Sequence, residues 1–156
     1  MNTLVTGGAG FIGSNICKRL VADGHQVVAI DNLSNGSVES IKELEGNNNF
    51  IFYEFDVNNT IKLRRIFDKH PFDMVFHLAA NADTAKGEEA PHEDIENTLF
   101  TTLNILEMMR VYDIKKFFFA SSSMCTEMQT SAFRSTVLLC VQYLIMEQVN
   151  LPVKHL

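Results

Sequence analysis

Thr6-Gly7-Gly8-Ala9-Gly10-Phe11-Ile12-Gly13-Ser14 is the stretch that decides the fold, because its glycines recur between a predicted strand and a predicted helix. Gly7 permits a sharp turn off the strand, Gly10 lets a pyrophosphate approach the backbone, and Gly13 lets the helix pack closely. The helix N-terminus then offers unpaired N–H groups to the phosphates. The alternative is a tight strand–helix turn that binds no ligand.

Strands and helices alternate along the chain outward from this turn. Short apolar runs between turn residues predict the strands, and apolar spacings of three and four predict the helices. This order predicts an α/β fold, a Rossmann-type doubly wound parallel sheet of order 3-2-1-4-5, truncated after about five strands. The predicted strands are 3–6, 26–31, 50–55, 73–78 and 116–121, and the predicted helices are 11–22, 38–45, 60–69 and 91–112.

Apolar side chains at helical spacing predict which faces of two helices are buried. Phe117, Phe118 and Phe119 predict a strand within the core. The predicted buried face of helix 11–22 carries Phe11, Ile12, Ile16, Leu20 and Val21, and that of helix 91–112 carries Ile95, Leu99, Leu103, Leu106 and Met109.

The composition is that of one globular domain. The chain has 156 residues, of which 46% are hydrophobic and 21% charged, and a net charge of −6. This acidity argues against nucleic-acid or membrane binding. Cys17, Cys125 and Cys140 have no metal-ligand spacing and predict reduced thiols in a cytoplasmic protein without a metal site. We expect no signal peptide and no membrane span.

Two carboxylates follow predicted strands at the sheet edge. Asp31 lies eighteen residues after Gly13 and is predicted to accept hydrogen bonds from an adenosine ribose. No Lys or Arg occurs within 32–41 to attract a 2′-phosphate, so NAD is favoured over NADP. The alternative is that Asp31 only caps a loop. Asp56-Val57 is predicted to meet the adenine edge, or to form a helix N-cap.

Together these motifs resemble the extended short-chain dehydrogenase/reductase family, in its NAD-dependent nucleotide-sugar epimerase/dehydratase branch, with UDP-glucose 4-epimerase-type enzymes as the nearest likeness. The resemblance covers residues 2–123. It rests on Thr6–Ser14, Asp31–Ser34, Asp56-Val57, His77-Leu78-Ala79-Ala80, Asn97 and Phe119-Ala120-Ser121-Ser122-Ser123, in that order.

The resemblance implies a role for each matching residue. Ser122 matches the catalytic Ser/Thr that hydrogen-bonds the sugar hydroxyl, and Asn97 a buried amide close to the cofactor. The implied NAD contacts are Gly7, Gly10, Phe11, Ile12 and Gly13 at the pyrophosphate, Asp31 and Asn32 at the ribose, Asp56 and Val57 at adenine, and Leu78, Ala79 and Ala80 on the nicotinamide side.

Some positions depart from the family or have a simpler explanation. Many 4-epimerases carry a lysine two residues after His-Leu-Ala-Ala, where this chain has Ala82, and Lys86 follows four residues later. The sugar is therefore left open. A histidine such as His77 at the end of a buried strand is more often a hydrogen-bonded core residue than a base.

The family's Tyr-x-x-x-Lys is missing after the serines, since Tyr143 is followed four positions later by Glu147. In the family this tyrosine is the general acid/base, so we expect the chain as written to be inactive. We assign residues 1–123 to the NAD-binding domain and 124–156 to an atypical tail, and we expect the substrate domain to be absent.

A shifted codon frame offers one origin for the tail. Each shifted triplet takes the third base of one codon and the first two bases of the next. Across residues 124–127 these triplets must encode Val and can then encode Tyr-Gly. Across residues 145–150 they can encode Tyr-Gly-Ala-Ser-Lys. We interpret the tail as the product of a frameshift near Ser123. The alternative is a naturally diverged tail in which 137–149 form a helix or strand.

Two classes of function follow. The resemblance implies 4-epimerisation of a UDP-sugar through a transient 4-keto intermediate, with a nucleotide-sugar substrate and a homodimer in the intact enzyme. The absence of Asp-Glu before the hidden Val-Tyr-Gly favours an epimerase over a dehydratase. The alternative is a non-catalytic dinucleotide-binding module or an NAD(P)-sensing regulator.

Overall fold

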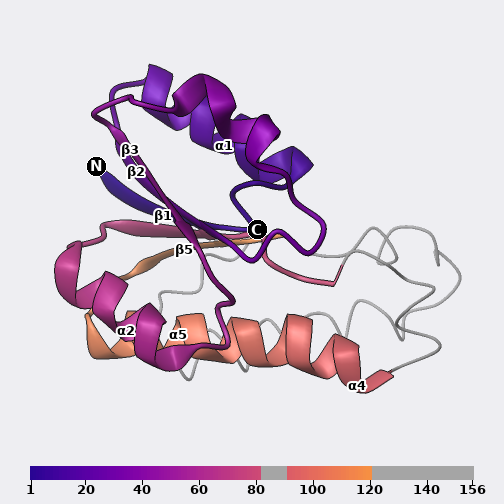
Figure 1. Cartoon of the computed structure of the whole chain (residues 1–156). Helices are drawn as coiled ribbons and strands as arrows, with labels where there is room; N and C mark the ends of the chain where they lie inside the picture. The colour runs from indigo at the N-terminus through magenta and orange to yellow at the C-terminus, as the bar shows by residue number, and fades with distance from the viewer. Residues whose placement is uncertain (82–90, 121–156) are drawn as a thin grey trace, which may run out of the picture.

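The computed structural model describes residues 1–81 and 91–120, which form one parallel sheet with helices on both faces (Figure 1). Its strands pair in the order β3-β2-β1-β4-β5, which confirms the predicted doubly wound arrangement. The bounds differ from the predicted ones by at most two residues. The strands are β1 (Asn2–Thr6), β2 (Gln26–Asp31), β3 (Phe50–Glu54), β4 (Met74–His77) and β5 (Lys116–Phe119).

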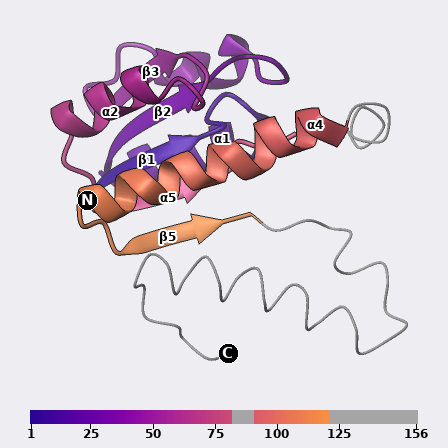
Figure 2. The ribbon, with the colours of Figure 1, turned by 90° about the horizontal axis from the view of Figure 1, so that it is seen from below.

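The helices form a layer on each side of the sheet (Figures 1 and 2). α1 (Phe11–Ala22) and the short 3-10 helix η1 (Val38–Leu44) cover one face. α2 (Thr60–Lys69) and α5 (Thr101–Val111) cover the other. α2 and the bounds of α1 agree with the sequence prediction, whereas the predicted helix at 38–45 is a 3-10 helix.

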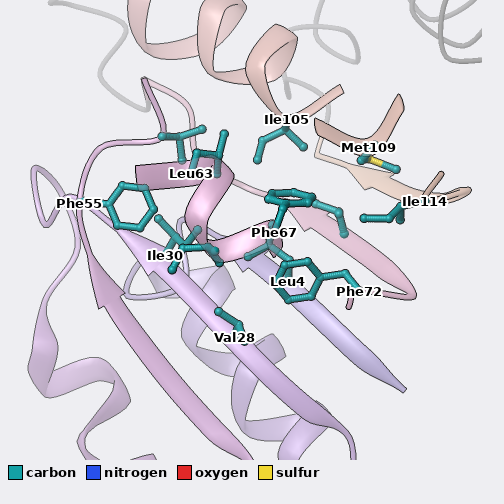
Figure 3. Close-up of a cluster of buried hydrophobic side chains, with 13 residues drawn as sticks. Leu4, Val28, Ile30, Phe55, Leu63, Phe67, Phe72, Ile105, Met109 and Ile114 are labelled. Carbon is teal, nitrogen blue, oxygen red and sulfur yellow. The ribbon is translucent and has the colours of Figure 1, made fainter. Parts of the chain in front are cut away.

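A separate apolar core fills the space on each side of the sheet. Successive side chains of a strand point to opposite faces, so Leu4 of β1 enters one core and Val5 the other, and neither is exposed to solvent. The larger core includes Leu63 and Phe67 of α2 and Ile105 of α5 (Figure 3). The central strand is therefore buried on both faces, as parallel sheets require.

The first turn of α1 does not bury the residues that the sequence predicted. Phe11 is 87% exposed and Ile12 60% exposed, because this turn lies beyond the sheet surface and beside an open cleft. The residues of α1 that are buried are Gly13, Ser14, Cys17 and Val21. The predicted apolar face was therefore wrong at its N-terminal end.

The predicted helix 91–112 is present as three consecutive segments. α4 (Pro91–Asp94) leads into a π-helical turn, η2 (Ile95–Phe100), and then into α5. A π-helical turn has a wider hydrogen-bond spacing and shifts the face that follows it. Ile95, Leu99 and Leu103 are each nearly half exposed instead of buried. The buried residues of α5 are Thr101, Thr102, Ile105, Leu106 and Met109.

The phenylalanine strand is only partly a core strand. Phe117 packs against the larger core, whereas Phe118 and Phe119 are exposed to solvent. The reason is the position of β5, which ends the strand order of the described residues and has a strand neighbour on one side only. The prediction of a buried strand was wrong for these two residues.

Candidate functional site

A cleft of about 530 Å³ opens where the carboxyl ends of the central strands meet the first turn of α1. Parallel α/β sheets bind ligands at this edge, where the strand order reverses. Ser122 and the tail 124–156 lie outside the described residues. The cleft is lined by every residue predicted to contact a cofactor, namely Gly7, Gly10, Phe11, Ile12, Gly13, Asp31, Asn32, Asp56, Val57, Leu78, Ala79, Ala80 and Asn97.

The glycine-rich loop is shaped by backbone contacts that a side chain would prevent. Gly7 has a φ of +69°, and a β-carbon there would come within 2.9 Å of the backbone of Leu78 and Ala79. Gly7 also donates its N–H to the carbonyl oxygen of Ile30 at 2.8 Å, which joins the loop to the end of β2. The loop is therefore held tightly between β2 and the segment after β4.

The N-terminus of α1 faces the cleft. Gly10 occupies the N-cap position, and no side chain in the described part of the chain accepts a hydrogen bond from the first turn. The N–H groups at the start of a helix have no partner within the helix and carry the positive end of its dipole. Gly10, Phe11, Ile12 and Gly13 all line the cleft, so this turn can bind an anionic group.

Asp31 connects two loops at the end of β2. Its Oδ2 accepts a hydrogen bond from the N–H of Ala9 at 2.9 Å, and its Oδ1 accepts one from Leu33 at 2.8 Å. The bond to Leu33 is the loop cap that the sequence left as an alternative. Each carboxylate oxygen can accept more than one hydrogen bond, and Asp31 lines the cleft. The loop-capping contact therefore leaves room for a ligand hydroxyl.

Asp56 does not cap a helix, so that alternative for this residue was wrong. The N-cap of α2 is Asn59, whose side chain accepts a hydrogen bond from Lys62 N. Asp56 instead accepts bonds from Asn58 N at 2.8 Å and from the Asn32 side-chain amide at 2.9 Å. The bond from Asn32 joins the loops after β2 and β3 on one side of the cleft.

His77 lies behind the cleft rather than in it. It is 1% exposed, and both ring nitrogens lie within hydrogen-bond distance of threonine hydroxyls. Burial lowers the pKa of His77 from its ordinary value of 6.5 to about 4, so the ring is neutral at physiological pH. These contacts confirm the interpretation of His77 as a hydrogen-bonded core residue.

The π-helical turn contributes polar groups to the lining of the cleft. Asn97 and Thr101 line the cleft, and the Thr101 hydroxyl donates to the Asn97 carbonyl at 3.0 Å. Asn97 is half-buried, whereas the resemblance implied a buried amide. Asn58 donates a side-chain hydrogen bond to the carbonyl of Glu96, which ties this turn to the loop after β3.

Several lining residues were not predicted from the sequence. Gly36 packs so closely that a β-carbon would come within 3.0 Å of the Asp31 carboxylate. Ser37 N donates to the carbonyl of Ala9, so the loop after β2 lies against the glycine-rich loop. The turn residues after Asp31 were the available signal. The further lining residues are Ile30, Ser34, Asn35, Gly36, Phe55, Asn81, Glu93, Thr101 and Ala120.

The charge of the cleft is negative among the described residues. Asp31, Asp56 and Glu93 line it, and no Lys or Arg does so in the parts of the chain that the structure covers. Within residues 1–81 and 91–120, no cluster of three His, Cys, Asp or Glu side chains could hold a metal ion. None of the helices in those ranges is long and apolar enough to cross a membrane.

Residues 3–137 match the model of the NAD dependent epimerase/dehydratase family, which is most of the chain. The chain belongs to this family. The match extends past Ser123, the boundary at which the sequence resemblance was placed.

Curated relatives of the chain within this family are UDP-sugar 4-epimerases. UDP-glucuronate 4-epimerase of Thermodesulfobacterium geofontis is 37% identical over 125 residues, which cover 77% of this chain and 39% of that protein. UDP-glucose 4-epimerase of Klebsiella pneumoniae is 34% identical over 125 residues, which cover 79% of this chain and 90% of that protein. The chain thus spans about two-fifths of the first relative.

Solved structures of the family share the fold. A UDP-glucose 4-epimerase from Thermotoga maritima with UDP-glucose superimposes with a TM-score of 0.82 and 31% identity, covering 97% of this chain and 53% of that one. A Thermus thermophilus UDP-glucose 4-epimerase in complex with NAD gives a TM-score of 0.78 and 27% identity, covering 97% and 52%. The five-stranded sheet is therefore that of the Rossmann part of these enzymes.

Proposed function

We propose that residues 1–123 form the NAD-binding part of a UDP-sugar 4-epimerase. One observation carries the proposal: the glycine-rich turn, Asp31 and the Leu78–Ala80 segment, which lie far apart in the sequence, line a single cleft. The family membership and the 4-epimerase relatives support the reaction class.

The residues of the cleft fit a dinucleotide along its length. The uncapped turn of α1 offers N–H groups for a pyrophosphate, beside glycines that leave the backbone accessible. Asp31 and Asp56 lie on the β2–β3 side, where ribose and adenine would be held. The other half of the dinucleotide would then lie along Ala79, Ala80 and Asn97.

The charges of the cleft favour NAD over NADP. Asp31 and Asp56 would repel a 2′-phosphate on the adenosine ribose, and no cation lines the described part of the cleft to offset that repulsion. Isothermal titration of the 156-residue chain with NAD should give one binding site, with NADP much weaker. A chain that binds neither dinucleotide would contradict the proposal.

The residues that line the cleft would hold NAD, which would supply reversible hydride transfer at C4 of the sugar. Residues of this chain would bind and orient the cofactor, and Ser122 would hydrogen-bond the sugar hydroxyl. Proton transfer requires a general acid/base, which the family's tyrosine supplies and which Tyr143, without its lysine, does not match. We therefore propose that the chain as written binds NAD and does not catalyse epimerisation.

Turnover distinguishes an epimerase from a non-catalytic dinucleotide-binding module or NAD(P)-sensing regulator. Conversion of UDP-glucose to UDP-galactose should be undetectable with this chain, and measurable turnover would refute the proposed inactivity. Sequencing of the coding DNA tests the frameshift interpretation of 124–156. A shifted frame that lacks Tyr-Gly-Ala-Ser-Lys or contains stops would refute it. For the intact family member we also propose a nucleotide-sugar substrate, a homodimer and a cytoplasmic location.

A further inference from the structure

A chain of hydrogen bonds runs behind the cleft from β1 to the π-helical turn, with His77 at its centre. Thr6 Oγ1 lies 2.7 Å from His77 Nδ1, and Thr102 Oγ1 lies 3.1 Å from His77 Nε2. All three side chains are buried. Their proton positions are therefore decided by their partners in the protein rather than by solvent.

Only one arrangement of protons satisfies these groups. The Thr102 hydroxyl donates its single proton to the carbonyl of Thr98 at 2.6 Å, so its oxygen can only accept from His77. His77 must then carry its proton on Nε2, and its Nδ1 accepts from the Thr6 hydroxyl.

The surroundings of Thr6 lead to the same tautomer. Thr6 Oγ1 accepts hydrogen bonds from the N–H groups of Leu78 at 3.2 Å and Ala79 at 3.3 Å. Its own proton therefore needs an acceptor, which His77 Nδ1 provides. A proton on Nδ1 would place two donors against each other between His77 and Thr6 and leave the Thr6 hydroxyl without this acceptor.

This Thr6–His77–Thr102 chain of hydrogen bonds, here called the relay, holds the Leu78–Asn81 segment, which lines the cleft. Its first residues, Leu78 and Ala79, are bound by Thr6, and the N–H of Asn81 donates to Thr98 Oγ1 at 3.1 Å. Thr98 belongs to η2, which the bond from Thr102 joins to the relay. The segment is therefore hydrogen-bonded at both ends, to Thr6 and to Thr98. His77 links these two contacts through its bonds to Thr6 and Thr102.

The aromatic neighbours of His77 hold the ring in place. Phe117 and Phe119 of β5 stack near it, with ring centroids 6.1 and 6.0 Å away and interplanar angles of 23° and 21°. Nearly parallel neighbouring rings restrict rotation of the imidazole, which is 1% exposed.

We propose that His77 is a positioning residue: in its Nε2–H form it orders the Leu78–Asn81 segment, through Thr6 and Thr102, to receive the nicotinamide half of the dinucleotide. This role rests on the proposed NAD binding. It predicts that a break in the relay weakens contacts to that half and spares the adenosine and pyrophosphate contacts, which come from Asp31 and the glycine-rich loop.

The test compares NAD with ADP, which lacks the nicotinamide riboside, on the full chain. Thr102→Val removes the acceptor for His77 Nε2 and should weaken NAD binding about tenfold, the effect of losing one buried hydrogen bond. Binding of ADP should stay within about twofold of wild type. Thr102→Ser keeps the hydroxyl and should restore NAD affinity.

Thr3→Val is the matched control, because Thr3 is a buried threonine of β1 whose hydroxyl has no hydrogen-bond partner in the described structure. It should leave both affinities unchanged. Nitrogen-15 NMR of the wild-type chain should show the Nε2–H tautomer for His77. This measurement does not depend on the folding of any variant.

The possible outcomes separate the two proposals. An Nδ1–H tautomer, or equal losses of NAD and ADP affinity in Thr102→Val, would overturn the positioning role while NAD binding by wild type stands. NAD affinity unchanged in Thr102→Val would overturn it as well. A wild-type chain that binds neither ligand would overturn the proposed function and the positioning role together, even with the Nε2–H tautomer present.

Discussion

A β-carbon on Gly13 would overlap the carbonyl oxygen of Gly7. Gly13 lies in the first turn of α1, and Gly7 begins the loop that leaves β1. The two glycines therefore set how closely the helix N-terminus approaches the end of the strand. The sequence predicted that Gly13 permits close packing of the helix, and the structure identifies the partner as the loop backbone.

Gly13→Ala should destabilise the chain and impair NAD binding together. The added methyl group forces the Gly7 carbonyl to move, and such overpacking costs about 2–3 kcal/mol in free energy of unfolding. The same movement displaces the N–H groups of the α1 first turn from the cleft. Urea unfolding and NAD titration measure the two effects.

Gly24→Ala is the control for Gly13→Ala. Gly24 has a φ of +81°, and apart from its chain neighbours no described residue has an atom within 4 Å of where its β-carbon would be. The substitution should cost about 1 kcal/mol through backbone strain alone and leave the dissociation constant for NAD unchanged. Equal effects of the two substitutions on NAD binding would contradict the packing argument.

Cys17 should be almost inert to alkylation in the folded chain. Burial raises the pKa of its thiol from 9.0 to about 12, and the thiolate is the form that reacts. At pH 8, iodoacetamide should modify the Cys17 peptide at least about 100-fold more slowly in the folded chain than in urea. Peptide mass spectrometry follows that residue separately, and comparable rates in the two states would show that the thiol is accessible.

The stability of the chain should fall as the pH decreases from about 6.5 toward about 4, because of His77. Its pKa is lowered from 6.5 in the unfolded chain to about 4 in the folded one, so the unfolded state binds the proton first. The full contribution is present above pH 6.5. About 3 kcal/mol is lost by pH 4, which follows from about 1.4 kcal/mol per pKa unit.

Urea unfolding at several pH values between 6.5 and 5 measures this slope. His70 contributes in the same direction, because burial and the charge of Lys69 lower its pKa. His70→Gln should therefore retain most of the slope, and NMR titration should show that His77 stays neutral at pH 5. If His70→Gln lost the pH dependence of stability, that dependence would come from His70 and not from His77.

Most of the sheet could be predicted because its signals are local. The run 26–31 is apolar and β-branched and ends at turn residues, and β2 has these bounds in the structure. That the candidate cofactor residues line one cleft could be predicted because a glycine-rich turn after a strand and a carboxylate after the next strand lie at the same edge of a parallel sheet.

The side-chain environments of the long helix could not be predicted in this way. A 3.6-residue period places Leu99 and Leu103 on a buried face, but the π-helical turn η2 rotates that face toward solvent and buries Thr102 instead. Thr102 is buried beside His77, whose Nε2 lies 3.1 Å from the Thr102 hydroxyl. That pairing joins residues twenty-five positions apart, and no local pattern encodes it.

Asp31→Asn should weaken NAD binding and reduce the preference for NAD over NADP. Both carboxylate oxygens accept backbone N–H groups, from Ala9 and Leu33, so the amide NH₂ of asparagine must face one of those donors. That conflict costs about 1–3 kcal/mol in free energy of unfolding and disturbs both loops. The loss of negative charge removes part of the repulsion of a 2′-phosphate.

Asp73→Asn is the matched control for Asp31→Asn. Asp73 also accepts a backbone hydrogen bond, from Asn2 N at 2.7 Å, but it lies before β4, at the end of the sheet opposite the cleft. Calorimetric titration with NAD and NADP should give wild-type affinities for Asp73→Asn. For Asp31→Asn, the dissociation constant for NADP divided by that for NAD should decrease at least about tenfold. The contact between the Asp31 charge and the ligand is worth more than about 1.4 kcal/mol, which corresponds to that factor. An unchanged ratio would show that Asp31 holds the loops without selecting the cofactor.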